Sequence, residues 1–463
     1  MNILLINPPN NPYTEKSLLI EPVDILTLAE YIKELGNNIN FIDMDLKQMD
    51  IDSLKKYIET QTTPDTVIIS YDYHIPLHTS KTIEIIKDMC NSLKNFGIKI
   101  ILIGKTISYS QDFAESLNFD IGIIGETELT LKELLKLETW DKKTLSNVKG
   151  IIYKLNGDII KNPYREEKIN LYCLPIIDRN LVDLKDYIDV RSMLTSRGCI
   201  NKCDFCPTFN FWGKWRGKIA IQVVAEIEEL IKKHNAEKIM FLDDNMTVDK
   251  QRMKEISKLI IEKKLKAKFG CLSSINNFDE ETFVEMYNAG FRWVHFGVET
   301  GSQKVLENNN KHFSVDYAKS VILKVKQIGY RVRTSFIFDL PTTEKQDMLD
   351  TINFILETEP DEVRGHFLAL RLGTKVYEQS SKKGKLTSQY IHRNVPEFET
   401  ENYSSEELMQ DVDFLTEKLK QRNYTIVNDV TKWNDINSIR NAEGKIKFLS
   451  FCPSRYGIDW EII

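Results

Sequence analysis

Short apolar runs alternate with amphipathic segments along the first 140 residues. The apolar runs predict strands at 2–7, 39–43, 66–71, 98–104 and 121–125. Segments with apolar residues at helical spacing predict helices at 25–35, 51–60, 80–93, 110–117 and 126–136. This alternation is typical of a doubly wound parallel sheet, a Rossmann-like α/β fold that binds ligands at the carboxyl ends of its strands. Because Pro8-Pro9 follows the first strand where a glycine-rich fingerprint would stand, a nicotinamide cofactor is not expected.

The same alternation returns after a break. Residues 141–190 contain a predicted hairpin, with its turn at Asn156-Gly157-Asp158, and a proline-dotted connector that we expect to cross the interface between two domains. Strands are predicted at 192–196, 238–242, 268–273, 293–297, 332–338 and 363–370, with helices between them. Residues 191–378 therefore form a second α/β domain. The tail, 379–463, has a predicted helix at 404–420 and mixed strand and loop, which indicates a small α+β region.

Composition narrows the class of protein. The 463 residues are 42% hydrophobic and 28% charged, enough to fill two or three cores. The net charge of −6 argues against a general nucleic-acid binder, and the basic residues Lys202, Lys214, Arg216 and Lys218 fit a solvated or substrate-facing loop better. The first residues lack the pattern of a signal peptide, and no apolar run approaches the roughly 20 residues of a membrane span. We expect a cytoplasmic protein, with a monomer as the default.

Three of the seven cysteines lie in one short stretch. Cys199, Cys203 and Cys206 are separated by three and then two residues, with Phe205 before the last cysteine. Three thiolates on one loop can hold three irons of a cubane [4Fe–4S] cluster, which leaves the fourth iron open to a small molecule. An odd number of cysteines with this clustering also suits a reducing compartment.

Other interpretations fit the loop when it is taken alone. A zinc ion could be bound by these residues and completed by a distant cysteine or histidine, or the three thiols could be incidental core residues. Structural zinc sites use four ligands and usually pair two two-ligand knuckles, whereas the other cysteines of this chain are solitary. The open-iron cluster is therefore the favoured hypothesis.

The cysteine spacing resembles the cluster loop of radical S-adenosylmethionine (radical SAM) enzymes. In that family SAM binds the open iron and is cleaved to a 5′-deoxyadenosyl radical, and the second domain is a partial (β/α)6 barrel with the cluster at its mouth. The resemblance implies that Phe205 packs against adenine and that Asp243-Asp244-Asn245 and Glu299 approach the SAM amino group, ribose and methionine portion. It further implies that Ser274 and Ser335 face the mouth and that Arg333 pairs with the SAM carboxylate. A capping role for Asp243 or Asp244 at the next helix is the structural alternative.

The first domain resembles the cobalamin-binding domain of a large class of radical SAM enzymes. The matching segments include Pro8-Pro9, Glu21-Pro22, the strand ending at Asp43, Leu102-Ile103-Gly104 and Ile123-Ile124-Gly125-Glu126. The resemblance implies a cobalamin site that involves Pro8, Tyr73, His74, Gly104, Gly125 and Glu126. Lys105-Thr106 replace a glycine and a proline that are usual after Gly104, and their bulk favours the alternative of a domain without cofactor. No histidine stands where other cobalamin methyltransferases have a lower ligand of cobalt. We therefore expect that neither His74 nor His78 ligates the metal.

Together the two resemblances imply an enzyme that abstracts hydrogen from an unactivated carbon and methylates it with cobalamin. Two rivals are a radical cyclase, rearrangement or oxidation enzyme without methyl transfer and a non-catalytic iron–sulfur binding or electron-transfer protein. The expected partners are a small-molecule or peptide substrate and an external one-electron reductant of the flavodoxin or ferredoxin kind. No motif selects the substrate or the carbon attacked.

Overall fold

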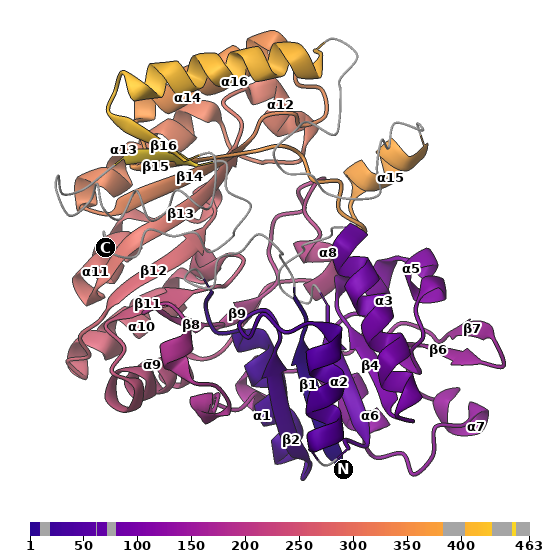
Figure 1. Cartoon of the computed structure of the whole chain (residues 1–463). Coiled ribbons are helices and arrows are strands. Elements are labelled where there is room, and N and C mark those ends of the chain that lie inside the picture. Colours follow the sequence, from indigo (N-terminus) through magenta and orange to yellow (C-terminus); the bar gives the residue numbers. More distant parts are fainter. Residues whose placement is uncertain (10–18, 62, 72–79, 383–402, 428–446, 451–463) are drawn as a thin grey trace. The chain divides into compact units, whose positions relative to one another are not determined.

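The computed structural model describes residues 1–9, 19–61, 63–71, 80–382, 403–427 and 447–450. The chain divides into two compact units, Met1–Ile188 and Asp189–Ile463. Each has its own sheet and its own hydrophobic core (Figure 1). None of the helices in the described part of the chain combines the length and apolar character that a membrane crossing requires.

The first unit is built on a seven-stranded sheet in the order β2-β1-β3-β4-β5-β6-β7. Its strands are β1 (Asn2–Asn7), β2 (Asn38–Asp43), β3 (Thr66–Ser70), β4 (Lys99–Ile103), β5 (Ile121–Ile123), β6 (Ile151–Leu155) and β7 (Asp158–Lys161). The first five run parallel, as the strand–helix alternation predicts. Ile3, Leu5 and Ile68 pack on one face of the sheet, whereas Leu4, Ile6 and Val67 pack on the other. The doubly wound prediction is confirmed by this burial of both faces.

Helices cover both faces of this sheet. They are α1 (Val23–Glu34), α2 (Ile51–Thr60), α3 (Ser80–Asn95), α4 (Lys105–Tyr109), α5 (Gln111–Ser116), α6 (Glu128–Leu134) and α7 (Lys142–Leu145). Apolar residues of α1 and α6 pack on one face, and those of α2, α3 and α5 on the other. Helix α4 was not predicted, because its five residues are too short for a periodic pattern.

Of the predicted hairpin and connector at 141–190, residues 141–188 lie in the first unit. Strands β6 and β7 extend the sheet because β6 pairs antiparallel with β5. The connector, with 3-10 turns at Leu171–Cys173, Arg179–Leu181 and Leu184–Asp186, packs back onto the same unit. Arg179 forms a buried ion pair with Glu21 at 3.6 Å, and the Tyr187 hydroxyl donates to Asp43 Oδ2 at 2.7 Å.

The second unit has an eight-stranded sheet in the order β16-β17-β15-β14-β13-β12-β11-β8. The six strands predicted for the second domain are β8 (Arg191–Met193), β11 (Lys238–Phe241), β12 (Lys268–Ser273), β13 (Phe291–Glu299), β14 (Arg331–Ile337) and β15 (Glu362–His366). They are parallel and stand in sequence order. The tail adds β17 (Lys447–Ser450) and β16 (Tyr424–Val427), so its described strands enlarge this sheet.

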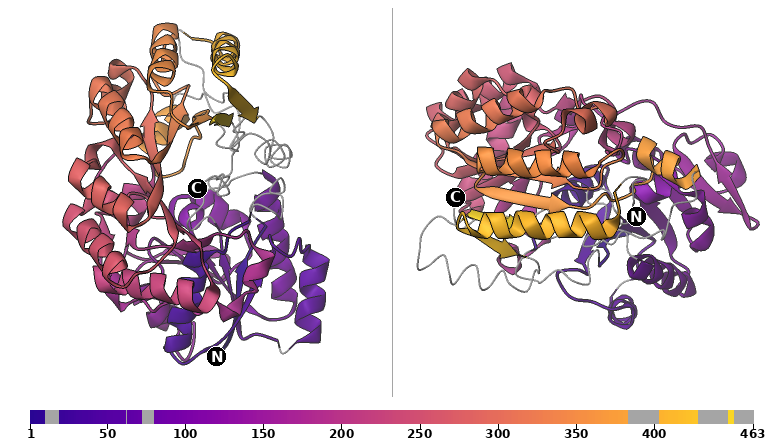
Figure 2. Two further views of the ribbon diagram at one scale, coloured as in Figure 1. Left: turned by 90° about the vertical axis from the view of Figure 1, so that its left-hand side faces the viewer. Right: turned by 90° about the horizontal axis from the view of Figure 1, so that it is seen from above.

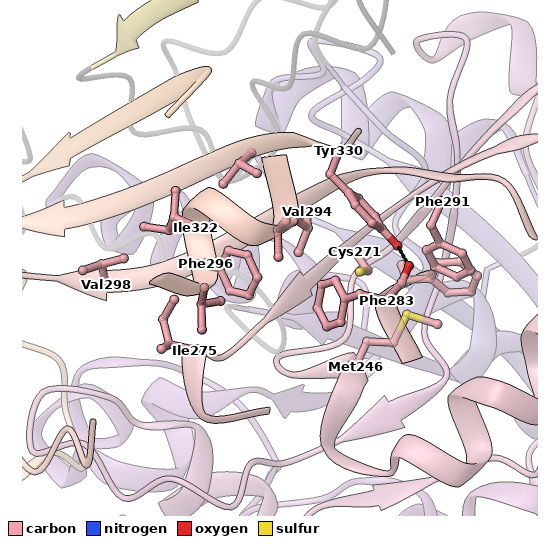
Figure 3. Packing of buried hydrophobic residues seen from close by; sticks show 14 of the residues in the cluster. Met246, Cys271, Ile275, Phe283, Phe291, Val294, Phe296, Val298, Ile322 and Tyr330 are labelled. Atoms are coloured by element: carbon pink, nitrogen blue, oxygen red, sulfur yellow. Dashed lines mark hydrogen bonds between the residues drawn. The ribbon is translucent and has the colours of Figure 1, made fainter. Parts of the chain in front are cut away.

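Helices pack along one side of this sheet (Figure 2). They are α9 (Ala220–His234), α10 (Lys250–Glu262), α11 (Glu280–Ala289), α13 (Val315–Ile328), α14 (Lys345–Thr358) and α16 (Ser405–Lys420). The shorter helices are α8 (Thr208–Trp212), α12 (Gln303–Asn308) and α15 (Lys375–Lys382), with 3-10 turns at Met246–Val248 and Ile275–Asn277. Figure 3 shows the core between sheet and helices, where the Tyr330 hydroxyl donates to the Phe283 carbonyl oxygen at 2.8 Å. This bond satisfies a buried phenol in an otherwise apolar layer.

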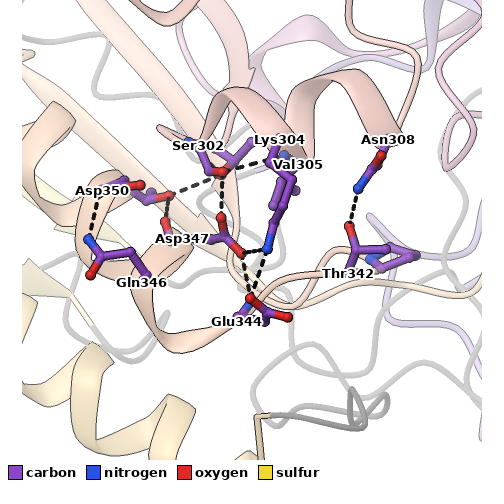
Figure 4. A network of polar contacts seen from close by, with 12 residues as sticks. Ser302, Lys304, Val305, Asn308, Thr342, Glu344, Gln346, Asp347 and Asp350 are labelled. Carbon is purple, nitrogen blue, oxygen red and sulfur yellow. Dashed lines mark hydrogen bonds and ion pairs between the residues drawn. The ribbon is translucent and has the colours of Figure 1, made fainter.

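Polar contacts fix the loops at the carboxyl ends of β13 and β14 (Figure 4). The Ser302 hydroxyl donates to Asp347 Oδ1 at 2.6 Å, and Lys304 Nζ lies 2.7 Å from Asp347 Oδ2. The Asn308 amide reaches across to the Thr342 hydroxyl at 2.9 Å. The two loops therefore hold each other at the edge of the sheet where ligands bind in parallel α/β folds.

Candidate active site

The three clustered cysteines lie on a loop whose two ends are paired. Ser196-Arg197 (β9) and Arg216-Gly217 (β10) form a short antiparallel pair that closes the base of the loop. Gly198 has φ +85°, and a Cβ atom there would lie 2.7 Å from the Gly213 carbonyl oxygen. Only glycine fits this crossing, which explains the Arg-Gly-Cys sequence before the first ligand.

Cations stack on aromatic rings around this loop. Arg197 lies 4.8 Å from the centroid of Trp212, and Lys202 lies 4.6 Å from that of Phe209. Two of the basic residues noted in the sequence, Lys202 and Arg216, therefore contact the loop's own structure, with Arg216 donating to the Trp212 carbonyl oxygen at 3.3 Å. The contact of the exposed Lys202 stabilises the loop by about 0.5–1 kcal/mol, whereas Arg197 stacks at a buried position.

The cysteine sulfurs are half-buried at the carboxyl edge of the sheet. Burial raises the pKa of the Cys199 thiol and raises the pKa of the Cys203 thiol to about 12. Among the described residues no group of three or more His, Cys, Asp or Glu side chains converges to hold a single metal ion. This arrangement still fits a cubane cluster, because each cysteine then binds a different iron and the three sulfurs need not meet at one point.

Amide side chains support the first cysteine. Asn245 Nδ2 donates to Cys199 Sγ at 3.7 Å and to Asn277 Oδ1 at 2.8 Å. Its Oδ1 accepts from the Ser274 backbone N–H at 3.3 Å, and the Ser274 hydroxyl accepts from Asn201 Nδ2 at 3.0 Å. The structure thus brings the predicted residues Asn245 and Ser274 together beside Cys199.

Asp243 occupies a different environment from the one predicted. Its side chain is fully buried and accepts hydrogen bonds from the backbone N–H of Thr195 at 3.1 Å and the Thr195 hydroxyl at 2.8 Å, and also from Ser196. Burial raises the pKa of this carboxyl. Asp243 therefore ties the segment before the cysteine loop to β11. Neither Asp243 nor the half-buried Asp244 caps the next helix, because Asp249 occupies that position.

Glu299 lies at an irregular strand end. The pairing of β13 and β14 shifts register between Gly297 and Glu299, and Glu299 has φ +74°, a conformation that is strained for a residue with a side chain. A Cβ atom on Gly297 would lie 2.3 Å from Glu299 Oε1, so glycine lets the carboxylate fold back over the strand.

Lys311 holds this carboxylate in place. Its Nζ donates to the Gly297 carbonyl oxygen at 2.8 Å and lies 3.2 Å from Glu299 Oε1. Burial alone would lower the pKa of Lys311, but the neighbouring Glu299 and Cys203 outweigh it and raise the pKa. A buried ion pair beside the cysteine loop can fix charge where a ligand binds.

A pocket opens beside the third cysteine. It is lined by Phe205, Cys206, Pro207, Glu299, Ile337, His366, Phe367, Leu368, Ala369 and Arg371. Of the predicted residues, Phe205 and Glu299 therefore share one cavity with Cys206. The walls are largely apolar, with one acidic and two basic side chains, which is typical of a small-molecule site.

Arg333 on β14 and Asp339 just after it are bound by other groups of the protein. Arg333, predicted to pair with the SAM carboxylate, is 1% exposed, stacks on Trp293 at 5.0 Å and pairs with Glu362. This guanidinium therefore binds the carboxylate of Glu362 on β15. Asp339, which follows β14, is buried and accepts from the backbone N–H of Leu368, in the pocket wall. Ser335 is buried on β14.

The residues predicted for cobalamin lie at the carboxyl edge of the first unit's sheet. Pro8 follows β1, Gly104 follows β4 with φ +140°, and Gly125 follows β5 with φ +79°. Glu126 is buried next to Gly125. The Ser108 hydroxyl joins two of these turns, because it donates to the Gly104 carbonyl oxygen at 2.6 Å and accepts from the Gly125 N–H at 2.9 Å. Tyr73, His74 and His78 lie outside the described residues.

Several residues of the site were missed by sequence analysis. Lys311, Asn201 and Asn277 contact predicted residues, but each stands outside the strand ends where we searched. The Asn309-Asn310-Lys311 run was visible as a polar stretch after a short helix. No spacing rule connects it with the cysteines, because the contact is made only by the folded sheet.

Comparison with known proteins agrees with the resemblance to radical SAM enzymes seen in the sequence. Residues 193–355 match the family model of the radical SAM superfamily. A protein of Pyrococcus horikoshii named an uncharacterized methyltransferase, PH0819, is 26% identical over 387 residues, which cover 82% of this chain and 83% of that protein. An anaerobic magnesium-protoporphyrin IX monomethyl ester cyclase of Cereibacter sphaeroides is 26% identical over 55% of this chain and 44% of that protein.

A solved structure resembles both units. The radical SAM methyltransferase TsrM from Kitasatospora setae, with cobalamin and a [4Fe–4S] cluster bound, superposes with a TM-score of 0.70 at 14% identity, covering 83% of this chain and 75% of that one. At this identity the likeness concerns the fold. It supports a Rossmann-like domain followed by a radical SAM domain in the present chain.

Proposed function

We propose that this chain, which belongs to the radical SAM superfamily by the match of residues 193–355, is a methyltransferase. It would use a [4Fe–4S] cluster, SAM and cobalamin to methylate an unactivated carbon of a biosynthetic substrate. The observation that carries this proposal is the loop with Cys199, Cys203 and Cys206 at the rim of a pocket that also contains Phe205 and Glu299. A three-cysteine loop leaves one iron for a ligand in that pocket.

The residues around the loop fit a cluster and SAM. Cys199, Cys203 and Cys206 would hold the cluster, and Asn245 would donate to the sulfur of Cys199. A cluster held by these cysteines would pass one electron from the external reductant to SAM, a reduction that yields methionine and a 5′-deoxyadenosyl radical able to take a hydrogen atom from the substrate. Glu299, held by Lys311, offers carboxylate oxygens to hydroxyl or ammonium groups of SAM.

The remaining contacts proposed for SAM follow from position. Phe205 offers a ring to adenine from the pocket wall. Asp244, Asn245 and Ser274 follow the ends of β11 and β12, and Ser335 lies within β14. Apolar pocket residues such as Ile337 and Phe367 exclude water, which protects a reactive intermediate from side reactions. Asp243 acts indirectly, because its bonds to Thr195 fix the segment that enters the cysteine loop.

The first unit fits cobalamin at the edge marked by Pro8, Gly104, Gly125 and Glu126. Glycines with positive φ, Gly104 and Gly125, form turns at these neighbouring strand ends, and the Tyr164 ring packs where a Cβ atom of residue 125 would stand. The bulkier Lys105, which argued for an empty domain, forms the first turn of α4 with its side chain buried. When bound, cobalamin supplies the methyl group. The likeness in fold to cobalamin-bound TsrM supports this assignment.

A cyclase or another radical reaction without methyl transfer is the second candidate function, because a relative is named a cyclase. Absorption spectra and cobalt analysis of protein purified without oxygen from cobalamin-supplied cells separate the two. Methyl transfer predicts corrin bands and about one cobalt per chain. Cluster absorption without cobalt would contradict cobalamin-dependent methylation. A non-catalytic electron-transfer role is excluded if the reduced protein cleaves SAM.

The partners we propose are a small-molecule or peptide substrate and a flavodoxin-like or ferredoxin-like reductant. The pocket beside Cys206 is of the kind that takes a small molecule. We also propose a cytoplasmic location, because the free cysteines of the described residues suit a reducing compartment. A monomer is the default that we propose for the oligomeric state. We propose as domain limits 1–140 for the cobalamin-binding domain, 141–190 for its hairpin and connector, 191–378 for the radical SAM domain and 379–463 for a substrate-shaping tail.

A further inference from the structure

Asp204, between two of the cluster cysteines, joins the cysteine loop to two other loops. Its Oδ2 lies 2.6 Å from Lys375 Nζ at the start of α15, and its Oδ1 accepts from Asn310 Nδ2 at 3.1 Å. Its backbone makes the same two connections. The Asp204 N–H donates to the Asn309 carbonyl oxygen at 3.3 Å, and its carbonyl oxygen accepts from the Val376 N–H at 3.2 Å.

The first of these partner loops is held firmly to the sheet. Asn309 Nδ2 donates to the carbonyl oxygens of Val305 at 2.9 Å and Pro341 at 3.3 Å. The preceding Asn308 bonds to Thr342 across the loop after β14 (Figure 4). The residue that follows, Lys311, holds Glu299 in the pocket. This loop therefore links Asp204 to the acidic wall of the pocket.

The second partner loop forms another wall. It starts at Arg371, which lines the pocket, and Thr374 closes a turn by donating its N–H to the Arg371 carbonyl oxygen at 3.3 Å. The Gly373 carbonyl oxygen accepts from Asn210 Nδ2 at 2.6 Å, just beyond the cysteines. The cysteine loop thus contacts this wall from both sides of Cys206.

We propose that Asp204 is a positioning residue, which sets the cluster cysteines relative to the two pocket walls through its bonds to Asn310 and Lys375. This inference rests on the proposed function of the pocket. A carboxylate that binds neither iron nor SAM would then determine where the open iron lies against Glu299 and Arg371. Small displacements of a positioned group weaken binding and catalysis because the reacting atoms lose their alignment.

Lys375→Met tests the proposal without touching the carboxylate. In the full chain without cofactors, we expect faster amide hydrogen exchange in peptides that cover 203–206 and 371–376. After cluster reconstitution, we expect an unchanged iron content and a two- to fivefold higher Kd for SAM in titrations of the reduced cluster's electron paramagnetic resonance signal. This change corresponds to about 0.4–1 kcal/mol, the range of partly exposed ion pairs. Lys375→Arg keeps the ion pair and should behave as wild type.

Lys324→Met is the matched control, because Lys324 forms an exposed ion pair of 2.6 Å with Glu280 on distant helices of the same unit. Asp204→Asn is the second test, since it removes the charge but keeps an acceptor for Asn310. The proposal is overturned if Lys375→Met and Asp204→Asn both match the control in hydrogen exchange and SAM titration. Failure of the wild-type protein to bind SAM would instead contradict the proposed function. The hydrogen-exchange experiment would still test the positioning role of Asp204.

Discussion

The side-chain amide of Asn245 lies 3.7 Å from the sulfur of Cys199, at the point where β11 ends beside the cysteine loop. The same nitrogen donates to Asn277 Oδ1 at 2.8 Å, which fixes its orientation. Hydrogen bonds to cluster sulfurs raise the reduction potential, because they stabilise the extra negative charge of the reduced state.

Asn245→Ala is therefore expected to lower the potential of the reconstituted cluster. A bond of about 0.5–1.5 kcal/mol corresponds to roughly 20–60 mV for one electron. A spectroelectrochemical titration measures this shift. Asn308→Ala is the control, since its amide bonds to the Thr342 hydroxyl rather than to Cys199. Equal potentials in wild type and Asn245→Ala would show that the amide does not act on the cluster.

Gly198→Ala is expected to prevent stable loading of the cluster. The new Cβ would lie 2.7 Å from the Gly213 carbonyl oxygen and force a residue with φ +85° to carry a side chain. The strain is of order 1–3 kcal/mol before the clash is added. Gly157→Ala is the control for a positive-φ glycine replaced away from the cysteine loop, because Gly157 has φ +90° in the turn between β6 and β7 and nothing within 4 Å of an added Cβ. Iron per chain after reconstitution should fall in Gly198→Ala and remain at the wild-type value in Gly157→Ala.

The strand–helix pattern predicted both sheets, and the cysteine spacing predicted the loop that closes between β9 and β10. Neither the pattern nor the spacing could predict which side chains bond to one another across neighbouring strands. Arg333 and Asp243 have the chemistry of SAM contacts, yet Glu362 and Thr195, distant in sequence, satisfy them. The position of Lys311 was equally hidden, because Lys311 follows Glu299 by 12 residues with α12 between them, and such a segment can return to the strand in many ways.

Glu362 should make the stability of the second unit pH dependent. Burial raises the pKa of this carboxyl, but Arg333 and Arg331 outweigh burial and hold the pKa below its usual value of 4.5. A lowered pKa in the folded state means that the stabilisation is complete above pH 4.5 and is lost as the pH falls through the lower pKa. Urea unfolding between pH 3 and 6, followed by tryptophan fluorescence, measures this loss.

Glu362→Gln should weaken that pH dependence and lower the free energy of unfolding at pH 6. Breaking a buried ion pair from one side typically costs about 3–5 kcal/mol, because the guanidinium groups remain buried. Glu280→Gln, in an exposed pair, should change stability by no more than about 0.5 kcal/mol. Equal unfolding curves for both variants would contradict the buried ion pair.

Tyr187→Phe should lower the thermal midpoint of the first unit. Such a loss would show that the connector unfolds together with that unit. The hydroxyl donates to Asp43 Oδ2 at 2.7 Å, and burial already raises the pKa of Asp43. Loss of one donor to a buried carboxyl costs about 1–3 kcal/mol. Tyr172→Phe is the control, because Tyr172 is 52% exposed on the same connector. An identical thermal midpoint for both variants would count against this assignment.

The most direct test of the account is reductive SAM cleavage by protein reconstituted without oxygen. Wild type and Cys173→Ser, which changes an exposed cysteine outside the loop, should each bind about four iron atoms per chain and release 5′-deoxyadenosine after reduction. Cys203→Ser should lose both properties. A wild-type protein that carries the reduced cluster but leaves SAM intact, or a Cys203→Ser variant that still cleaves it, would contradict the assignment of this loop as a radical SAM centre.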